Sequence, residues 1–189
     1  KEFYYGLTAD MIISTMNKLG GIISYEDLEQ YRPIESFPIE FSYRGNKIIS
    51  MPPSSSGGVT LALILNQLEN IDISSFTFQD SRHVHYLVEA EKNAYENRHQ
   101  YLGDSNFIDI PFDKLLSKKY AEDEFLSIND SLSTNSNEIE KNINFNNESE
   151  ETTHFSIIDE FGNCVSLTTT LNGWFGNGIT IENAGFLLN

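Results

Sequence analysis

The chain has 189 residues, of which 28 are acidic and only 12 are lysine or arginine, so its formal charge is −16. Hydrophobic residues make up 39%, enough for a packed core, which excludes a wholly disordered chain. The negative charge would repel phosphate groups, so we expect neither nucleic acid nor an anionic membrane as a partner. Cys164 is the single cysteine and cannot form an internal disulfide or a thiolate metal cluster. No run of residues approaches the roughly 20 apolar residues of a membrane span.

The first part of the chain, residues 1–126, has the pattern of a mostly helical region with one hairpin. Apolar periodicity and capping residues predict helices over 8–19, 24–31, 59–70, 81–98 and 111–126. We expect Thr8 and Ser24 to cap the first and second of these helices, and either Asp80 or Ser81 to cap the fourth. Alternating apolar residues over 37–51, interrupted by Arg44-Gly45-Asn46, predict a hairpin.

The composition changes at residues 127–151, which are rich in asparagine, serine and glutamate and have no sustained period. We interpret this segment as a flexible linker. Strand patterns resume at 152–159 and 164–172, and we expect more strand over 179–188. The predicted organisation is therefore 1–126, a linker at 127–151, and 152–189.

The common catalytic motifs do not occur in this sequence: it has no nucleophile elbow, phosphate-binding loop or zinc-protease motif. His83 and His85 are two residues apart on a predicted helix, so they point to different faces and make a poor metal pair. We expect both to be surface or packing residues, and Cys164 to be a small strand residue without a reactive thiol.

The junction before Thr152 is the feature that could carry catalysis. If the 151–152 peptide bond is cut, Thr152 gains a free α-amine that can act as general base for its own hydroxyl. An α-amine has a pKa of about 7.7–8.0, so a useful fraction is neutral at pH 7. An ordinary linker that ends at a β-hairpin would give the same pattern. The residues alone therefore do not decide between a self-cleavage site before Thr152 and such a linker.

The chain resembles the γ-glutamyltranspeptidase family over its whole length and in order. Downstream of the junction the matching motifs are T-T-H-F-S at 152–156, D-E-F-G-N at 159–163, T-T-T-L-N at 168–172 and F-G-N-G-I at 175–179. Upstream they are Y-R-G at 43–45, M-P-P-S-S-S-G-G at 51–58, I-L-N at 64–66, E-A-E-K at 89–92 and Y-L-G-D at 101–104.

The resemblance implies an α+β fold, part of the four-layer αββα sandwich of N-terminal-nucleophile hydrolases. It implies a precursor that cleaves itself between Glu151 and Thr152 into a large and a small subunit, with Thr152 as the nucleophile of both cleavage and turnover. By matching motifs, the Thr170 hydroxyl would hydrogen-bond the nucleophile and Asn172 would contact the glutamyl group. Thr168 shares the strand face of Thr170 and would assist processing.

The implied reaction passes a γ-glutamyl group from glutathione or a related amide to water, or to the amine of an amino acid or dipeptide. The resemblance implies no metal or organic cofactor, and it implies export to the periplasm or outside the cell. The chain reads as a segment cut at both ends, so we expect it to be inactive by itself. Gly173-Trp174 departs from the small polar residues of many relatives and puts glutathione as the donor in question.

Two alternatives remain beside the leading hypothesis of a γ-glutamyl acyltransferase and hydrolase. A relative with the same fold could use another acyl donor, as a poly-γ-glutamate depolymerase or a cephalosporin-acylase-like amidase does. A non-catalytic homologue that never matures is the other; the presence of both Thr152 and Thr170 argues against it.

Overall fold

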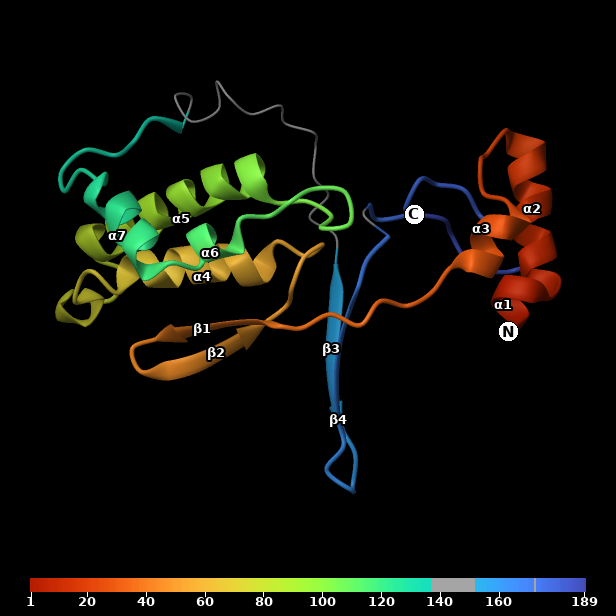
Figure 1. Ribbon diagram of the computed structural model, residues 1–189, viewed down its shortest axis with the longest axis horizontal. Helices are drawn as coiled ribbons and strands as arrows, with labels where there is room; N and C mark the ends of the chain where they lie inside the picture. Colours follow the sequence, from red (N-terminus) through yellow and green to blue (C-terminus); the bar gives the residue numbers. More distant parts are fainter. Residues whose placement is uncertain (137–151, 172) are drawn as a thin grey trace. The chain divides into compact units, whose positions relative to one another are not determined.

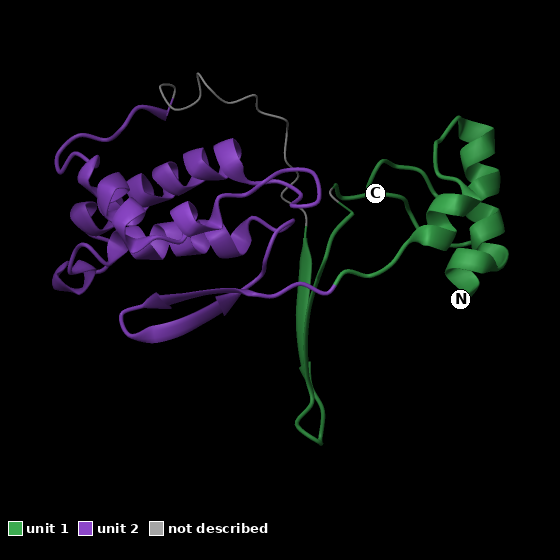
Figure 2. Cartoon of the chain, in the orientation of Figure 1, with its two compact units in different colours: residues 1–34, 145–189 green, residues 35–144 purple. Residues whose placement is uncertain are grey.

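The computed structural model describes residues 1–136, 152–171 and 173–189 (Figure 1). These residues form helices and two antiparallel two-stranded sheets, which confirms the expected α+β class. The chain divides into two compact units: unit 1 comprises 1–34 and 145–189, and unit 2 comprises 35–144 (Figure 2). None of the described helices combines the length and the apolar character needed to cross a membrane.

Unit 2 begins with the predicted hairpin, formed by β1 (Ile39–Tyr43) and β2 (Asn46–Ser50). The turn between them has positive φ at both Arg44 (47°) and Gly45 (78°). Two positive φ angles are typical of the tight turns whose twist matches that of the flanking strands. The turn therefore sets the register, in which Tyr43 pairs with Asn46.

Helices α4 (Gly57–Leu68) and α5 (Ser81–Tyr101) pack side by side in unit 2, and the short 3₁₀ helix η1 (Ile73–Ser75) lies between them in sequence (Figure 1). Of the two caps expected for α5, the structure has Asp80, whose carboxylate accepts a hydrogen bond from the His83 backbone N–H at 2.8 Å. The main core of unit 2 is formed by Ile39, Val59, Leu63, Ala94, Ile110 and Leu115. Burial of these apolar side chains against one another is what stabilises the helix pair.

The single helix predicted over 111–126 is wrong. The structure has two helices there, α6 (Phe112–Leu115) and α7 (Lys118–Leu126). Ser117 has extended backbone angles, and its side chain accepts a hydrogen bond from the Tyr120 backbone N–H. A serine in this position begins a new helix instead of continuing the previous one.

Gly58 in the first turn of α4 lies against the backbone of the loop before the helix. A Cβ atom at this position would come 2.1 Å from the carbonyl oxygen of Met51, and the backbone cannot yield as a side-chain end can. We predict that Gly58→Ala lowers the free energy of unfolding by roughly 1–3 kcal/mol, which urea unfolding would measure.

The matched control for this substitution is Gly57→Ala, one residue earlier in the same helix. Its Cβ would meet only the Ser55 hydroxyl at 3.5 Å, an ordinary contact. Since alanine also favours the helix, this variant should be as stable as the wild type or slightly more stable. Equal losses in the two variants would show that crowding against Met51 is not the cause.

The described residues of unit 1 form three helices: α1 (Glu2–Tyr5), α2 (Leu7–Leu19) and α3 (Tyr25–Gln30). Helix α1 was not predicted, and α2 begins at the N-cap Gly6, so the prediction of Thr8 as its cap is wrong. The Thr8 N–H and hydroxyl instead donate to the Glu2 carboxylate. Ser24 caps α3 as predicted, in a reciprocal pair with Asp27.

The prediction of more strand over 179–188 is also wrong. A turn at 182–184 folds this segment back on itself, with one isolated bridge between Thr180 and Leu187. Ile181 is fully buried in the core of unit 1 and packs with Ile12 and Met16 of α2. The apolar residues that resembled a strand therefore anchor a turn against a helix.

Candidate active site

The candidate site is built on a second hairpin, in unit 1, formed by β3 (Thr153–Ile158) and β4 (Cys164–Thr169). Its turn is held by Asp159, whose carboxylate accepts hydrogen bonds from the side chain of Asn163 and from the backbone N–H of Asn163 and of Phe161. These bonds, those of Asn163 most of all, lower the pKa of Asp159. Gly162 supplies the positive φ of 81° that the turn requires.

The register of this hairpin decides which side chains share a face. His154 lies opposite Thr168, and Ser156 lies opposite Ser166. The His154 Nδ1 atom is 2.8 Å from the Thr168 hydroxyl, so these polar residues form one connected face of the hairpin. Side chains alternate along a strand, so Phe155 and Leu167 lie on the opposite, apolar face.

The two threonines predicted to be catalytic lie at the open end of this hairpin. Thr153 pairs with Thr169 at the end of the ladder, and Thr152 and Thr170 are the residues directly before and after that pair. Both residues line a single cavity of about 410 Å³, together with Thr153 and Thr169. The fold thus brings a candidate nucleophile and a second hydroxyl to the same cavity from adjacent strands.

The segment after β4 forms the remaining wall of this cavity. Gly173 and Trp174 line it, so the indole whose bulk was expected beside the pocket lies there. Trp174 is 78% exposed and can contact a molecule that enters the cavity. This aromatic wall is a candidate determinant of which acyl groups or acceptors fit.

The other predicted site residues have different outcomes. Thr168 lies on the polar face with His154, one pair further from the open end than Thr169, and does not line the cavity. Glu151 and Asn172 lie outside the described residues. The roles assigned to Thr152, Thr168 and Thr170 therefore remain predictions, supported for Thr152 and Thr170 by their shared cavity.

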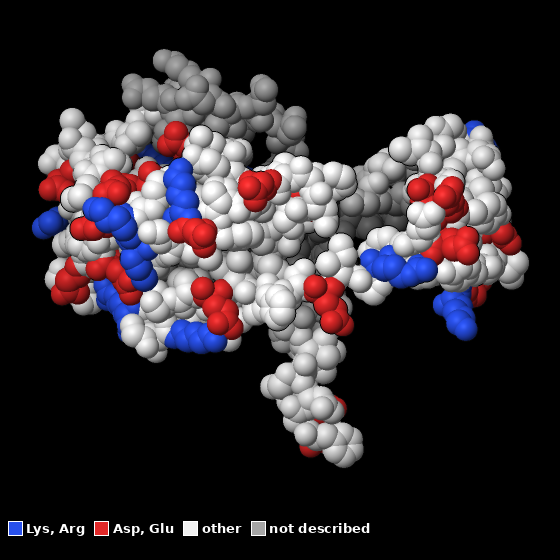
Figure 3. Space-filling model, in the orientation of Figure 1, with Lys and Arg blue, Asp and Glu red and all other residues white. Residues whose placement is uncertain are grey.

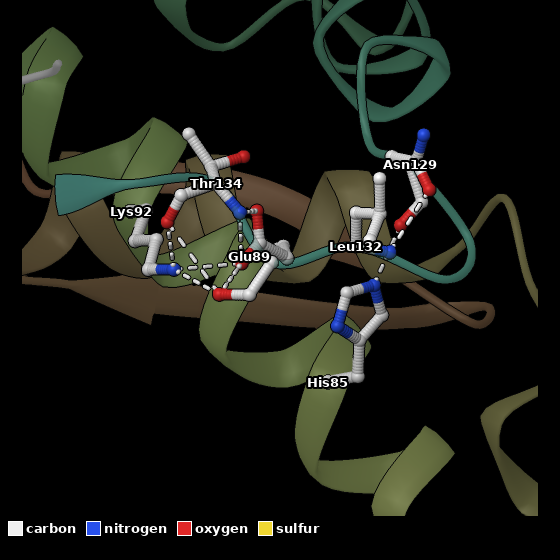
Figure 4. A network of polar contacts seen from close by, with 7 residues as sticks. His85, Glu89, Lys92, Asn129, Leu132 and Thr134 are labelled. Atoms are coloured by element: carbon white, nitrogen blue, oxygen red, sulfur yellow. Dashed lines mark hydrogen bonds and ion pairs between the residues drawn. The ribbon is translucent and has the colours of Figure 1, made fainter.

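A polar network that the sequence did not indicate holds the segment 129–134 on helix α5 (Figure 4). The Glu89 carboxylate accepts hydrogen bonds from the Lys92 ammonium at 2.7 Å, from the Ser133 hydroxyl at 3.1 Å and from the Thr134 N–H at 3.2 Å. One turn earlier, His85 Nε2 lies 2.7 Å from the carbonyl oxygen of Asn129. This part of the predicted linker is therefore fixed to α5.

Glu89 is almost fully buried, with 2% of the residue exposed. Burial raises the pKa of this carboxyl, but the hydrogen bonds and charge of Lys92 and the bonds from Thr134 outweigh it and lower the pKa to about 2. The charged form is thus the one that the fold stabilises. Helical spacing could have suggested only the Lys92 partner of Glu89, because Ser133 and Thr134 come from a segment about 45 residues later.

The two histidines and the cysteine that the sequence analysis considered lie outside the candidate active site. His85 contacts the 129–134 segment, and the His83 ring packs at its edge against Phe78, so the two histidines face different partners as predicted. Cys164 is exposed at the start of β4. Within residues 1–136, 152–171 and 173–189, no three histidine, cysteine, aspartate or glutamate side chains gather in a way that could hold a metal ion.

Comparisons with known proteins agree on one family. The family model described as gamma-glutamyltranspeptidase matches residues 1–189. The chain is 43% identical over 192 residues to a glutathione hydrolase proenzyme of Escherichia coli K12, covering 100% of this chain and 32% of that protein. It is 36% identical over 191 residues to the acylase ACY 1 proenzyme of Pseudomonas sp. SE83, covering 98% and 33%. The chain thus spans about a third of the length of the curated relatives it matches.

Solved structures give the same answer. The γ-glutamyltranspeptidase of Helicobacter pylori matches 72% of this chain and 39% of its own, with 44% identity and a TM-score of 0.69. A cephalosporin acylase from Bacillus halodurans matches 99% of this chain and 32% of its own, with 25% identity and a TM-score of 0.78. The chain has the fold expected for part of an N-terminal-nucleophile hydrolase sandwich. It belongs to the γ-glutamyltranspeptidase family.

Proposed function

We propose that this chain carries the nucleophile of a self-processing γ-glutamyl acyltransferase and glutathione hydrolase. The observation that carries the proposal is the position of Thr152, at the head of β3 and in one cavity with Thr170. Relatives that match the whole chain are named glutathione hydrolase proenzymes, which supports cleavage of one precursor into two subunits.

Maturation begins with the Thr152 hydroxyl attacking the carbonyl carbon of Glu151. The C–N bond breaks and a C–O ester bond forms, while the hydroxyl proton passes to the departing amine. Water then hydrolyses the ester, which leaves a carboxylate on Glu151 and the free α-amine and hydroxyl of Thr152. The large subunit then ends at 151 and the small subunit begins at 152, with residues 127–151 as the linker that carries the cut.

Turnover uses the same oxygen a second time. The neutral α-amine of Thr152 accepts the hydroxyl proton as the oxygen attacks the γ-carbonyl of the donor, and that proton passes to the leaving amine. A γ-glutamyl ester of Thr152 results, and water or the amine of an amino acid or dipeptide resolves it. The Thr170 hydroxyl positions the nucleophile, and Asn172 contacts the glutamyl group. We further propose that the mature protein acts in the periplasm or outside the cell.

The second candidate function is amide hydrolysis with another acyl donor. It is favoured by the Trp174 indole in the cavity wall and by the acylase relatives. The test is to compare glutathione with a glutaryl amide, which lacks the donor's α-amine, as substrates of the purified full-length protein. Release of glutamate from glutathione at a higher kcat/KM supports the leading proposal, and preference for the glutaryl amide overturns it in favour of the acylase.

Trp174 should influence which acceptor the acyl-enzyme uses. Replacing the indole with serine enlarges the cavity beside Thr152, so Trp174→Ser should change the ratio of transfer to hydrolysis with a bulky dipeptide acceptor by about tenfold. The ratio can be measured from the two products in one assay. Phe175→Ser is the matched control, since Phe175 is similarly exposed but does not line the cavity. Equal effects of the two variants would rule out a specific role for the indole.

A further inference from the structure

His154, on the polar face of the β3–β4 hairpin, has no part in the acyl transfer proposed above, yet both of its ring nitrogens have partners. Nδ1 lies 2.8 Å from the Thr168 hydroxyl. Nε2 lies 3.1 Å from the Ser166 hydroxyl and 3.3 Å from the Ser156 hydroxyl. Since Thr168 and Ser166 belong to β4, the ring links the two strands through both nitrogens.

The His154 ring lies next to the cavity of the candidate site without lining it. Towards the open end of the hairpin, the next pair of the register is Thr153 with Thr169. Both members of that pair line the cavity, as Thr152 does, whereas His154 does not. Any effect of the imidazole on the reacting atoms therefore passes through the strands that it links.

No ion pair can join β3 to β4, because residues 152–158 and 164–171 contain no lysine, arginine, aspartate or glutamate. Figure 3 shows the acidic side chains of this hairpin at its turn. A two-stranded hairpin is only marginally stable, and cross-strand pairs of side chains stabilise it. The bond between His154 and Thr168 lies nearer the open end than the 3.4 Å bond between the Ser156 and Ser166 hydroxyls.

The role of this ring rests on the proposed function, in which the chain is cut before Thr152. In the uncut precursor, Thr152 is held by the chain on both sides. After the cut, Thr152 is the first residue of the small subunit and His154 is the third. Chain ends are poorly ordered unless a contact holds them. Because a displacement of about 1 Å can lower an enzymatic rate about a hundredfold, a nucleophile at a chain end needs an anchor close by.

We propose that His154 is a positioning residue that anchors the new N-terminus of the small subunit. Its Nδ1 bond to Thr168 fixes β3 against β4 next to the cavity, and so holds the amine and hydroxyl of Thr152 beside Thr170. The anchor acts on turnover more than on maturation, because only the cut chain has a free end to hold.

The test compares three substitutions of His154 in the full-length protein, with glutathione as the donor. His154→Ala should be cut before Thr152 as the wild type is, but its kcat should be about tenfold lower while KM stays within about twofold. Asparagine places an amide atom near the position of Nδ1, whereas glutamine places its amide near that of Nε2. His154→Asn should therefore recover most of kcat, and the matched control His154→Gln should recover less.

Hydrogen exchange in the cut protein measures the anchor independently of activity. The backbone amides of residues 153–157 should exchange at least about fivefold faster in His154→Ala than in the wild type, and at the wild-type rate in His154→Asn. Equal exchange or equal kcat in wild type and His154→Ala, or a His154→Ala protein that stays uncut, would overturn the proposal. Recovery by glutamine as complete as that by asparagine would overturn the assignment to the Thr168 bond.

Failure of the proposed function would look different from failure of the anchor. A wild-type protein that stays uncut, or that releases no glutamate from glutathione, would overturn the proposed function and the anchor with it. An active wild type whose His154→Ala variant is equally active would overturn the anchor alone.

Discussion

Replacing Thr152 with alanine should leave the full-length protein as one uncut chain that transfers no acyl group. One oxygen is proposed to attack both the Glu151 carbonyl and the γ-glutamyl amide, so its removal blocks maturation and turnover together. The expected result on a denaturing gel is a single band, and activity should fall to the level of the buffer. Rate losses of this kind reach about a millionfold where a nucleophile is removed.

The companion substitution Thr152→Ser keeps the hydroxyl and removes only the methyl group. We expect it to mature and to turn over, but more slowly than the wild type. If Thr152→Ala were cut at the same bond, the proposed mechanism of maturation would be wrong. If Thr152→Ser behaved like Thr152→Ala, the methyl group would be needed to orient the hydroxyl.

Replacing Glu89 with glutamine should give a large loss of stability. The folded-state pKa of about 2, against an ordinary value of 4.5, corresponds to about 3 kcal/mol at neutral pH. Because the folded pKa is depressed, this contribution is fully present above pH 4.5 and disappears as the pH falls towards 2. Urea unfolding at pH 7, 4 and 3 should therefore show a difference between wild type and Glu89→Gln that shrinks with acidity.

The matched control for this measurement is Glu96→Gln, an exposed glutamate on the same helix. It removes the same charge without touching the 129–134 segment, so its unfolding free energy should stay within about 0.5 kcal/mol of the wild type. A difference between Glu89→Gln and wild type that is constant from pH 7 to pH 3 would contradict the assigned role of the carboxylate.

Local signals in the sequence predicted the elements that local chemistry decides. Ser24 with Asp27, Asp80, and the turn at Arg44-Gly45 each form contacts within a few residues, and each was confirmed. The helix over 111–126 failed because Ser117 can either continue a helix or cap a new one, and periodicity does not distinguish the two.

Tertiary contacts decide the features that the sequence missed. The apolar residues of 179–188 have the pattern of a strand, yet Ile181 is used to cover α2 from a turn. In the sequence, Glu89 does not differ from other glutamates on predicted helices. Its role follows from the hydrogen bonds that residues 133 and 134 donate to its carboxylate. Thr152 and Thr170 were named by motifs that match the γ-glutamyltranspeptidase family in order, and their catalytic roles stay predictions.

The central claim, self-cleavage before Thr152, is tested most directly by intact mass and N-terminal sequencing of the purified full-length protein. The account predicts two chains, with the smaller one beginning Thr-Thr-His-Phe-Ser. A folded protein that stays as one uncut chain, or one cut at another bond, would contradict it.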